Sequence, residues 1–172
     1  MLISKELESQ MNKQIGAEFG ASFQYVSIAS YFDAENLPEL AAFFYRQADE
    51  ESMHAMKFVH YINEAGGQVR IPSVDGPKFD FKSAEECAQL ALDWEMEVTR
   101  QINALMDLAI EQKDHIAQDF LRWFVNEQLE EVSTMDQLLS VVRRAGDNVL
   151  WVEDFLARNP IVEEGHGGEE AA

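Results

Sequence analysis

Apolar side chains recur at the three- and four-residue spacing of an α-helix along four long stretches of the chain. Clusters of proline and glycine separate these stretches. Ser4 is a suitable N-cap, Pro38 suits a first helical turn, and Ser83 with Glu86 has the spacing of a capping box. The pattern predicts helices over about 4–34, 38–66, 84–112 and 115–145, and a short fifth helix over 148–158. We therefore expect an all-α fold.

The connection between the second and third predicted helices is unusually long. Residues 66–82 contain two prolines, three glycines and no helical periodicity. At about 3.3 Å per extended residue, this segment is long enough to run the length of a helix. The two helices that it joins are then parallel, and the chain forms a four-helix bundle with one long crossover.

Each of the four long helices has a glutamate in the middle of its apolar face. The four residues are Glu18, Glu51, Glu95 and Glu131. At 1.5 Å per residue, each lies about 20–25 Å from the hairpin end that its helix shares with its partner. Packing of the helices as a bundle therefore brings four carboxylates to one level.

Ionised carboxylates in a bundle interior need a compensating positive charge, since burial and mutual repulsion both oppose ionisation. His54 follows Glu51 by three residues on the same helix face. Carboxylates with one imidazole suit Fe(II) or Mn(II) better than calcium or structural zinc, and we expect two iron ions. Glu18 and His54 would bind one ion. Glu95 and Glu131 would bind the other, and Glu51 would bridge both.

Composition and charge narrow the class of protein. The formal net charge of −19 argues against a nucleic-acid partner, because neutralising phosphates requires an excess of Lys and Arg. No stretch approaches the roughly 20 apolar residues of a membrane span. The first ten residues are too charged for a signal peptide, and Cys87 has no second cysteine to pair with. We expect a cytoplasmic protein.

The length of 172 residues fits one domain, which we expect to occupy residues 1–158. Residues 159–172 form a Gly-rich, acidic tail, expected to be disordered.

The site motifs resemble those of bacterial non-haem ferritins, in register, over residues 1 to about 158. The resemblance rests on Glu18 with Tyr25 seven residues later, Glu51-Ser-Met-His54, Glu95, and Glu127-Gln-Leu-Glu130-Glu131. It implies oxidation of Fe(II) by oxygen or peroxide at the dinuclear site, and storage of a ferric mineral inside a homo-oligomeric shell of 24 subunits.

The same resemblance assigns further residues. Gln128 would lie beside the second iron, and Tyr25 corresponds to a tyrosine thought to supply an electron during oxygen reduction. A third metal site is typical of bacterial ferritins. Its matching positions here are Glu50, Glu127, Glu130 and Glu131. From spacing alone, these glutamates could equally form a solvated helix face.

Two departures from the bacterioferritin pattern argue against a haem cofactor. Bacterioferritins repeat Glu-x-x-His on their fourth helix, where this chain has Gln128 and Glu131. They also place a haem-binding methionine two residues before the position of His54, where this chain has Ser52. We therefore expect no haem.

Two other functions stay open at this point. A ferritin-like peroxidase or oxygenase would use the same site on a substrate, although the single cysteine excludes an added Cys-x-x-Cys iron domain. A bundle that only buffers metal ions would bind iron without turnover. The fifth helix favours assembly into a shell, because Leu150, Trp151 and Phe155 make it too apolar for a monomer's surface.

The remaining histidines, His60, His115 and His166, have no carboxylate at ligand spacing on a shared face, so we expect them at the surface. We interpret Trp94 and Trp123 as packing residues and Cys87 as a small buried hydrophobic side chain.

Overall fold

The computed structural model describes residues 2–159 and 161, which contain five α-helices and no β-strand. The helices are α1 (Lys5–Ala34), α2 (Pro38–Glu64), α3 (Ala84–Glu111), α4 (His115–Ala145) and α5 (Val149–Arg158). The prediction of an all-α bundle with a short fifth helix is confirmed, and the bounds agree to within about two residues. The predicted tail lies outside the described residues, apart from residues 159 and 161.

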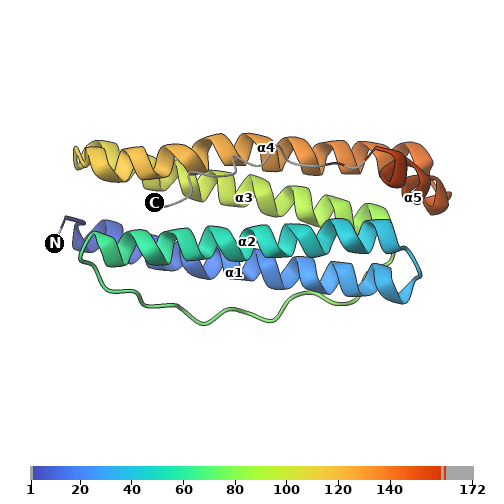
Figure 1. Ribbon diagram of the computed structural model, residues 1–172, viewed down its shortest axis with the longest axis horizontal. Helices are drawn as coiled ribbons and strands as arrows, with labels where there is room; N and C mark the ends of the chain where they lie inside the picture. Colours follow the sequence, from blue (N-terminus) through green and yellow to red (C-terminus); the bar gives the residue numbers. More distant parts are fainter. Residues whose placement is uncertain (1, 160, 162–172) are drawn as a thin grey trace, which may run out of the picture.

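The four long helices form two antiparallel hairpins that lie side by side, α1 with α2 and α3 with α4 (Figure 1). Residues 65–83 cross over from the end of α2 to the start of α3 at the opposite end of the bundle (Figure 1). Helices α2 and α3 are therefore parallel, as the length of the connection predicts. Helix α5 packs against α2 and α4. Within the described part of the chain, no helix combines the length and apolar character needed to cross a membrane.

The crossover is bound to α1 along its length. The side-chain amide of Gln24 donates to the carbonyl of Lys78 and accepts from its N–H, both at 2.9 Å. Further along, Pro72 packs so closely on Gly16 that a Cβ atom at Gly16 would lie 2.4 Å from the proline ring. A glycine is required there because the crossover passes directly over the helix backbone.

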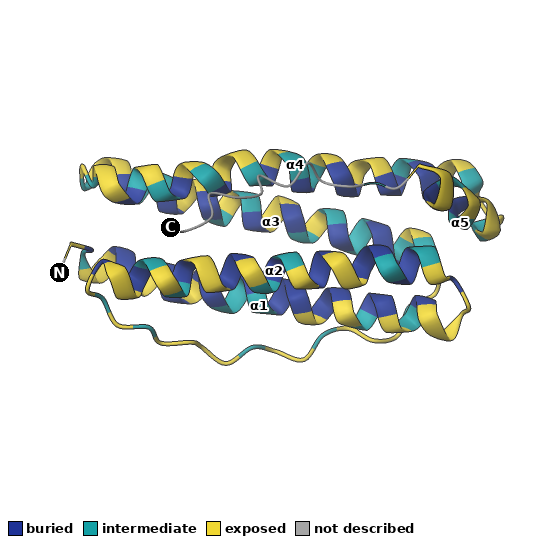
Figure 2. Ribbon diagram, in the orientation of Figure 1, coloured by how far each residue is buried: buried dark blue, intermediate teal, exposed yellow. Residues whose placement is uncertain are grey.

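Buried residues line the facing sides of the helices (Figure 2). The apolar core divides into two clusters, one on each side of the middle of the bundle. Phe32, Phe44 and Leu138 belong to the cluster near α5, and Phe58 and Phe124 to the cluster at the other end. On every long helix, the predicted glutamate lies between the residues of one cluster and those of the other. The middle layer of the bundle is therefore polar and buried.

The apolar stripe that the sequence predicts for α3 consists of Ala88, Leu92, Glu95, Thr99, Ile102, Met106 and Ala109. Of these, Ala88, Glu95, Ile102 and Ala109 are buried. Leu92, Thr99 and Met106 are half-buried, and Leu92 and Met106 pack against the core clusters. Ala91, Val98 and Leu105 are buried as well, so the buried face extends one position beyond the predicted stripe.

Helices α1 and α3 begin with the serine caps that the sequence predicts, and the capping box of α3 differs from the usual one in a single contact. The Ser4 hydroxyl accepts from the N–H of Leu7, and the Ser83 hydroxyl accepts from the N–H of Glu86. The Glu86 carboxylate accepts from the N–H of Lys82, one residue before the one that a capping box requires.

The start of α2 is capped by a residue more than one hundred positions away. Leu37 precedes the helix and makes no side-chain cap, and Pro38 has no N–H to satisfy. The Glu153 carboxylate of α5 accepts from the N–H groups of Glu39 and Leu40, both at 2.9 Å. Its negative charge also faces the positive end of the α2 dipole. Glu153 therefore joins α5 to the bundle.

Replacing Glu153 with Ala should lower the free energy of unfolding by about 1–2 kcal/mol, because two helix N–H groups lose their acceptor. Chemical denaturation followed by circular dichroism measures the loss. Asp154→Ala is the matched control, since among the described residues Asp154 forms only an exposed pair with Arg158. That control should change stability by less than about 0.5 kcal/mol. Equal effects of the two substitutions would contradict the capping role.

Candidate metal centre

The polar layer contains the five residues predicted to bind metal. Glu18 comes from α1, Glu51 and His54 from α2, Glu95 from α3 and Glu131 from α4. None of them is more than 3 % exposed. Each helix therefore delivers its ligand to the same interior level. The structure brings the five side chains together, and their binding of metal remains a prediction.

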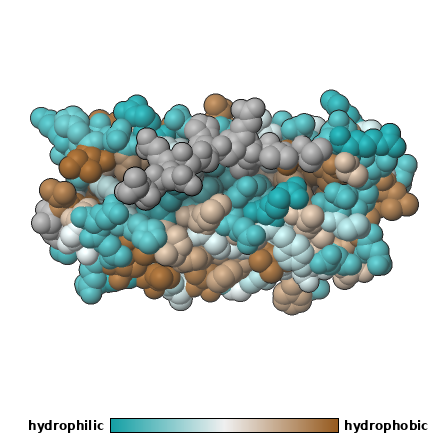
Figure 3. All heavy atoms as spheres, viewed as in Figure 1, coloured by the Kyte–Doolittle hydropathy of each residue, from teal (hydrophilic) through white to brown (hydrophobic). Residues whose placement is uncertain are grey.

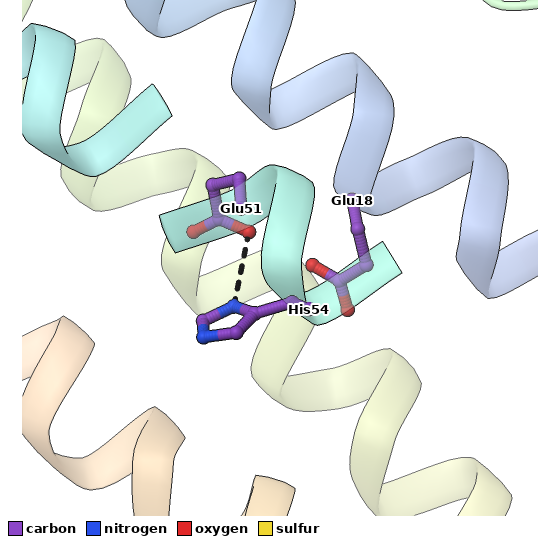
Figure 4. A group of neighbouring side chains, drawn as sticks. All are labelled: Glu18, Glu51 and His54. Atoms are coloured by element: carbon purple, nitrogen blue, oxygen red, sulfur yellow. Dashed lines mark hydrogen bonds and ion pairs between the residues drawn. The ribbon is translucent and has the colours of Figure 1, made fainter. Parts of the chain in front are cut away.

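Glu18, Glu51 and His54 form the first group of possible ligands, with one donor atom from each lying within 4.8 Å of the others. His54 Nδ1 lies 3.3 Å from Glu51 Oε2. Figure 4 shows the Glu18 side chain extending from α1 toward the two side chains of α2. This group offers two carboxylates and one imidazole to a single ion.

Glu51, Glu95 and Glu131 form the second group, with the same 4.8 Å limit between donor atoms. Both oxygens of Glu95 accept hydrogen bonds, Oε1 from the Tyr25 hydroxyl and Oε2 from the Gln128 side-chain amide at 3.2 Å. Glu51 belongs to both groups. A carboxylate shared by two groups is the arrangement that a bridging ligand requires.

A third group consists of His54, Glu127 and Glu131. His54 Nε2 lies 3.7 Å from Glu127 Oε1, so the two nitrogens of the ring face different carboxylates. Among the described residues, the three ligand groups do not contain Glu50 or Glu130, which are half-buried nearby. The Glu50 carboxylate accepts from the Gln47 side chain. A third metal site that uses Glu50 and Glu130 remains a prediction.

The carboxylate layer shifts the pKa of its members. Complete burial raises the pKa of Glu95 to about 7, and the charge of Glu18 adds to the rise. Burial, followed by the charges of Glu95 and Glu51, raises the pKa of Tyr25 well above its usual value. Burial alone would favour neutral His54, but the contact with Glu127 and the charges of Glu18 and Glu131 raise its pKa to about 9. The site therefore holds protons that a metal ion must displace.

The donor set fits iron. Oxygen donors with one imidazole nitrogen are typical of Fe(II) and Mn(II) sites, and the cluster offers no thiolate. Glu18 Oε2 is buried and has no hydrogen-bond partner among the described residues. A buried carboxylate oxygen without a partner is costly unless a cation binds it. Two divalent ions would compensate the negative charge of the layer.

Gln14 is a contact that the sequence analysis missed. Its side-chain amide donates to Glu18 Oε1 at 2.9 Å from one helical turn earlier in α1. The four-residue spacing between Gln14 and Glu18 is the signal that could have identified it.

The other histidines, the cysteine and the tryptophans lie as expected wherever the structure describes them. His60 and His115 are exposed, whereas His166 lies outside the described residues. Cys87 is fully buried in the apolar cluster near α5. Trp94 packs against both clusters. Trp123 packs edge-on against the His54 ring at 5.4 Å, so it forms one wall of the site.

At a pH above about 9, where His54 has lost its proton, replacing Glu18 with Gln should stabilise the metal-free protein by about 1 kcal/mol or more, because one buried charge is removed without a change of size. Thermal unfolding in the presence of a chelator measures this gain. Added divalent metal should stabilise the variant less than the wild-type protein. A metal-free variant less stable than wild type would contradict the view that these carboxylates oppose folding without cations.

The metal-free protein should lose stability as pH rises from about 5 to 9. Glu95 has a folded-state pKa of about 7 against an ordinary 4.5, so ionising it costs folding free energy between these values. His54 stabilises the fold while protonated, and this contribution is lost as pH rises from 6.5 through about 9. The free energy of unfolding, measured at several pH values across this range, tests this loss. In the Glu95→Gln variant, it should change little between about pH 5 and pH 7. Divalent metal should reverse the trend, since metal affinity rises as these protons leave.

Comparison with known proteins identifies the family. The model of the ferritin-like domain matches residues 8–145. The chain is 41 % identical over 156 residues to ferritin BfrB of Mycolicibacterium smegmatis, covering 91 % of this chain and 86 % of that protein. It is 45 % identical over 148 residues to ferritin BfrB of Mycobacterium tuberculosis, covering 86 % and 82 % of the two chains. It is 37 % identical over 147 residues to the bacterial non-haem ferritin of Staphylococcus aureus, covering 86 % and 89 %.

The fold agrees with these relationships. An open-pore ferritin from the hyperthermophilic archaeon Archaeoglobus fulgidus superimposes with a TM-score of 0.88 at 31 % identity, over 91 % of this chain and 97 % of that one. Membership supports iron binding and assembly into a homo-oligomer. The chain therefore belongs to the ferritin family, and its function is iron storage.

Proposed function

We propose that this iron-storage protein oxidises Fe(II) at a dinuclear centre inside each subunit. The observation that carries the proposal is the pair of ligand groups that share Glu51. One group would bind the first ion through Glu18, Glu51 and His54, and the other would bind the second through Glu51, Glu95 and Glu131. Two ions held by one carboxylate are close enough to deliver two electrons to one oxidant.

The chemistry balances with either oxidant. Two Fe(II) ions lose one electron each. These electrons, with two protons, reduce oxygen to hydrogen peroxide, or reduce hydrogen peroxide to two water molecules. The protein supplies orientation and negative charge, which favours the more highly charged Fe(III) product.

Tyr25 is suited to supply one electron to the oxidant in place of an electron from iron, which keeps the two-electron balance. Its hydroxyl donates to Glu95 in the fully buried layer. A phenol that loses an electron becomes strongly acidic, and Glu95 is in position to take the proton. The Gln128 amide also donates to Glu95 and would hold this acceptor in place.

The oxidised iron would be stored as a ferric mineral in the cavity of a shell of 24 subunits. Exposed apolar residues support such an assembly. Leu150 and Trp151 of α5 are 68 % and 42 % exposed. A surface groove of about 820 Å³ between α1 and the crossover is lined by Phe23, Val26 and Phe79. Figure 3 shows further hydrophobic residues among hydrophilic ones on one face of the subunit. Contacts between subunits would cover surfaces of this kind.

Replacing both Glu51 and His54 with Ala should slow Fe(II) oxidation more than about 100-fold. Loss of a residue that only orients a metal ligand already costs about 10- to 100-fold, and this variant loses two ligands. Stopped-flow absorbance after aerobic mixing with Fe(II) measures the rate. The matched control is His60→Ala, an exposed histidine on the same helix.

The control should oxidise iron at the wild-type rate, and light scattering should show the same large particle for all three proteins. Unchanged kinetics in the double variant would refute the assignment. Wild-type protein that binds two ions per subunit without rapid oxidation would instead indicate a metal buffer. Electron microscopy after iron loading should reveal a shell with a dense core.

A further inference from the structure

We propose that Gln14 is a positioning residue that fixes the orientation of the Glu18 carboxylate, so that one of its oxygens is held toward the first iron ion. The inference rests on the proposed dinuclear centre and adds a residue to it. Two observations support it: the hydrogen bond from Gln14 to one oxygen of Glu18, and the burial of the other oxygen without a hydrogen-bond partner among the described residues.

Gln14 lies one helical turn before Glu18, and both side chains are buried, at 4 % and 1 % exposure. The Gln14 amide donates to Glu18 Oε1 at 2.9 Å. Glu18 Oε2 is buried and has no hydrogen-bond partner within the described part of the chain. One oxygen of this carboxylate is therefore occupied by the protein, and the other is left for a cation.

This hydrogen bond restricts the rotation of the carboxylate. The terminal torsion of a glutamate is broad, so without a donor the plane of the carboxylate would rotate freely. Because Gln14 and Glu18 are on the same helix, the donor stays fixed relative to the ligand when other helices move. Gln14 thus holds Glu18 ready for the group formed with Glu51 and His54.

An amide suits this role better than a charged donor. Lysine or arginine would form a salt bridge with Glu18 and weaken its attraction for a metal ion. The neutral amide orients the carboxylate and leaves its charge for the cation. Glu95 is held differently, since its two oxygens accept from Tyr25 and Gln128 on other helices.

Gln14 lies beside a groove, so an apolar side chain of similar size can replace it without a steric clash. Gln14 lines a groove of about 480 Å³ between α1 and α3, together with Gln10, Ala17 and Leu105. A leucine at position 14 has space on this side and a partly apolar neighbourhood. We therefore expect Gln14→Leu to fold and assemble, while the Glu18 carboxylate loses its donor.

The experiment uses the full-length, assembled, metal-free protein and Co(II) as the probe ion. Wild-type protein, Gln14→Leu and Gln10→Leu are titrated and followed by visible absorption. Gln10→Leu is the matched control, with the same substitution in the same groove one turn earlier, at a side chain that accepts a hydrogen bond from Lys13. Thermal unfolding of the three metal-free proteins is measured alongside.

Gln14→Leu should weaken the binding of one of the two Co(II) ions by about 10- to 100-fold and leave the other unchanged, as expected for loss of a residue that orients a ligand. In iron oxidation, it should raise the Fe(II) concentration for half-maximal rate more than it lowers the maximal rate. Gln14→Met, which keeps the length of the side chain without a donor, should behave like Gln14→Leu. Gln10→Leu should match wild type in every measurement.

Several results would overturn the proposal. If Gln14→Leu binds both ions like wild type, Gln14 does not position Glu18, while the dinuclear centre stands. If both ions are weakened equally and the metal-free variant is less stable, the role is structural. If wild-type protein binds fewer than two Co(II) ions and oxidises no Fe(II), the proposed function itself fails, and the role of Gln14 fails with it.

Discussion

The burial of several carboxylates at one level is the constraint on which the rest of the structure depends. Glu18, Glu51, Glu95 and Glu131 are each at most 1 % exposed. Such a layer is unfavourable in a metal-free bundle, and apolar clusters on both sides must hold the helices together around it. The fold therefore stabilises a site that opposes folding until cations bind. This division of roles accounts for the separation of the core into two clusters.

A second consequence concerns hydrogen bonds. A carboxylate in the interior needs donors, but each donor that carries a full positive charge would compete with the metal. The side chains that donate to Glu18 and Glu95 are neutral: the amides of Gln14 and Gln128 and the hydroxyl of Tyr25. Neutral donors orient the ligands without replacing the cation. Within residues 2–159, the basic side chain of this layer is His54, and it is itself a ligand candidate.

The parts of this arrangement that depend on periodicity could be predicted from the sequence. A stripe of apolar residues fixes which side of a helix is buried, and a glutamate on that stripe is buried with it. The buried face of α3 also includes Ala91, Val98 and Leu105, which lie beside the predicted stripe and which apolar spacing alone does not single out. The cap that Glu153 provides for α2 could not be predicted, because it joins residues 113 and 114 positions apart through the final packing of α5.

The candidate site also contains contacts that sequence spacing could not predict. Sequence spacing placed His54 beside Glu51, but it could not show that the two ring nitrogens face different ligand groups, Nδ1 toward Glu51 and Nε2 toward Glu127. A neutral imidazole has one lone pair and one N–H. When one nitrogen binds a metal ion, the other can only donate. His54 can therefore complete the group with Glu18 or the group with Glu127, but not both at once. The overlap of the ligand groups thus makes these two uses of His54 mutually exclusive.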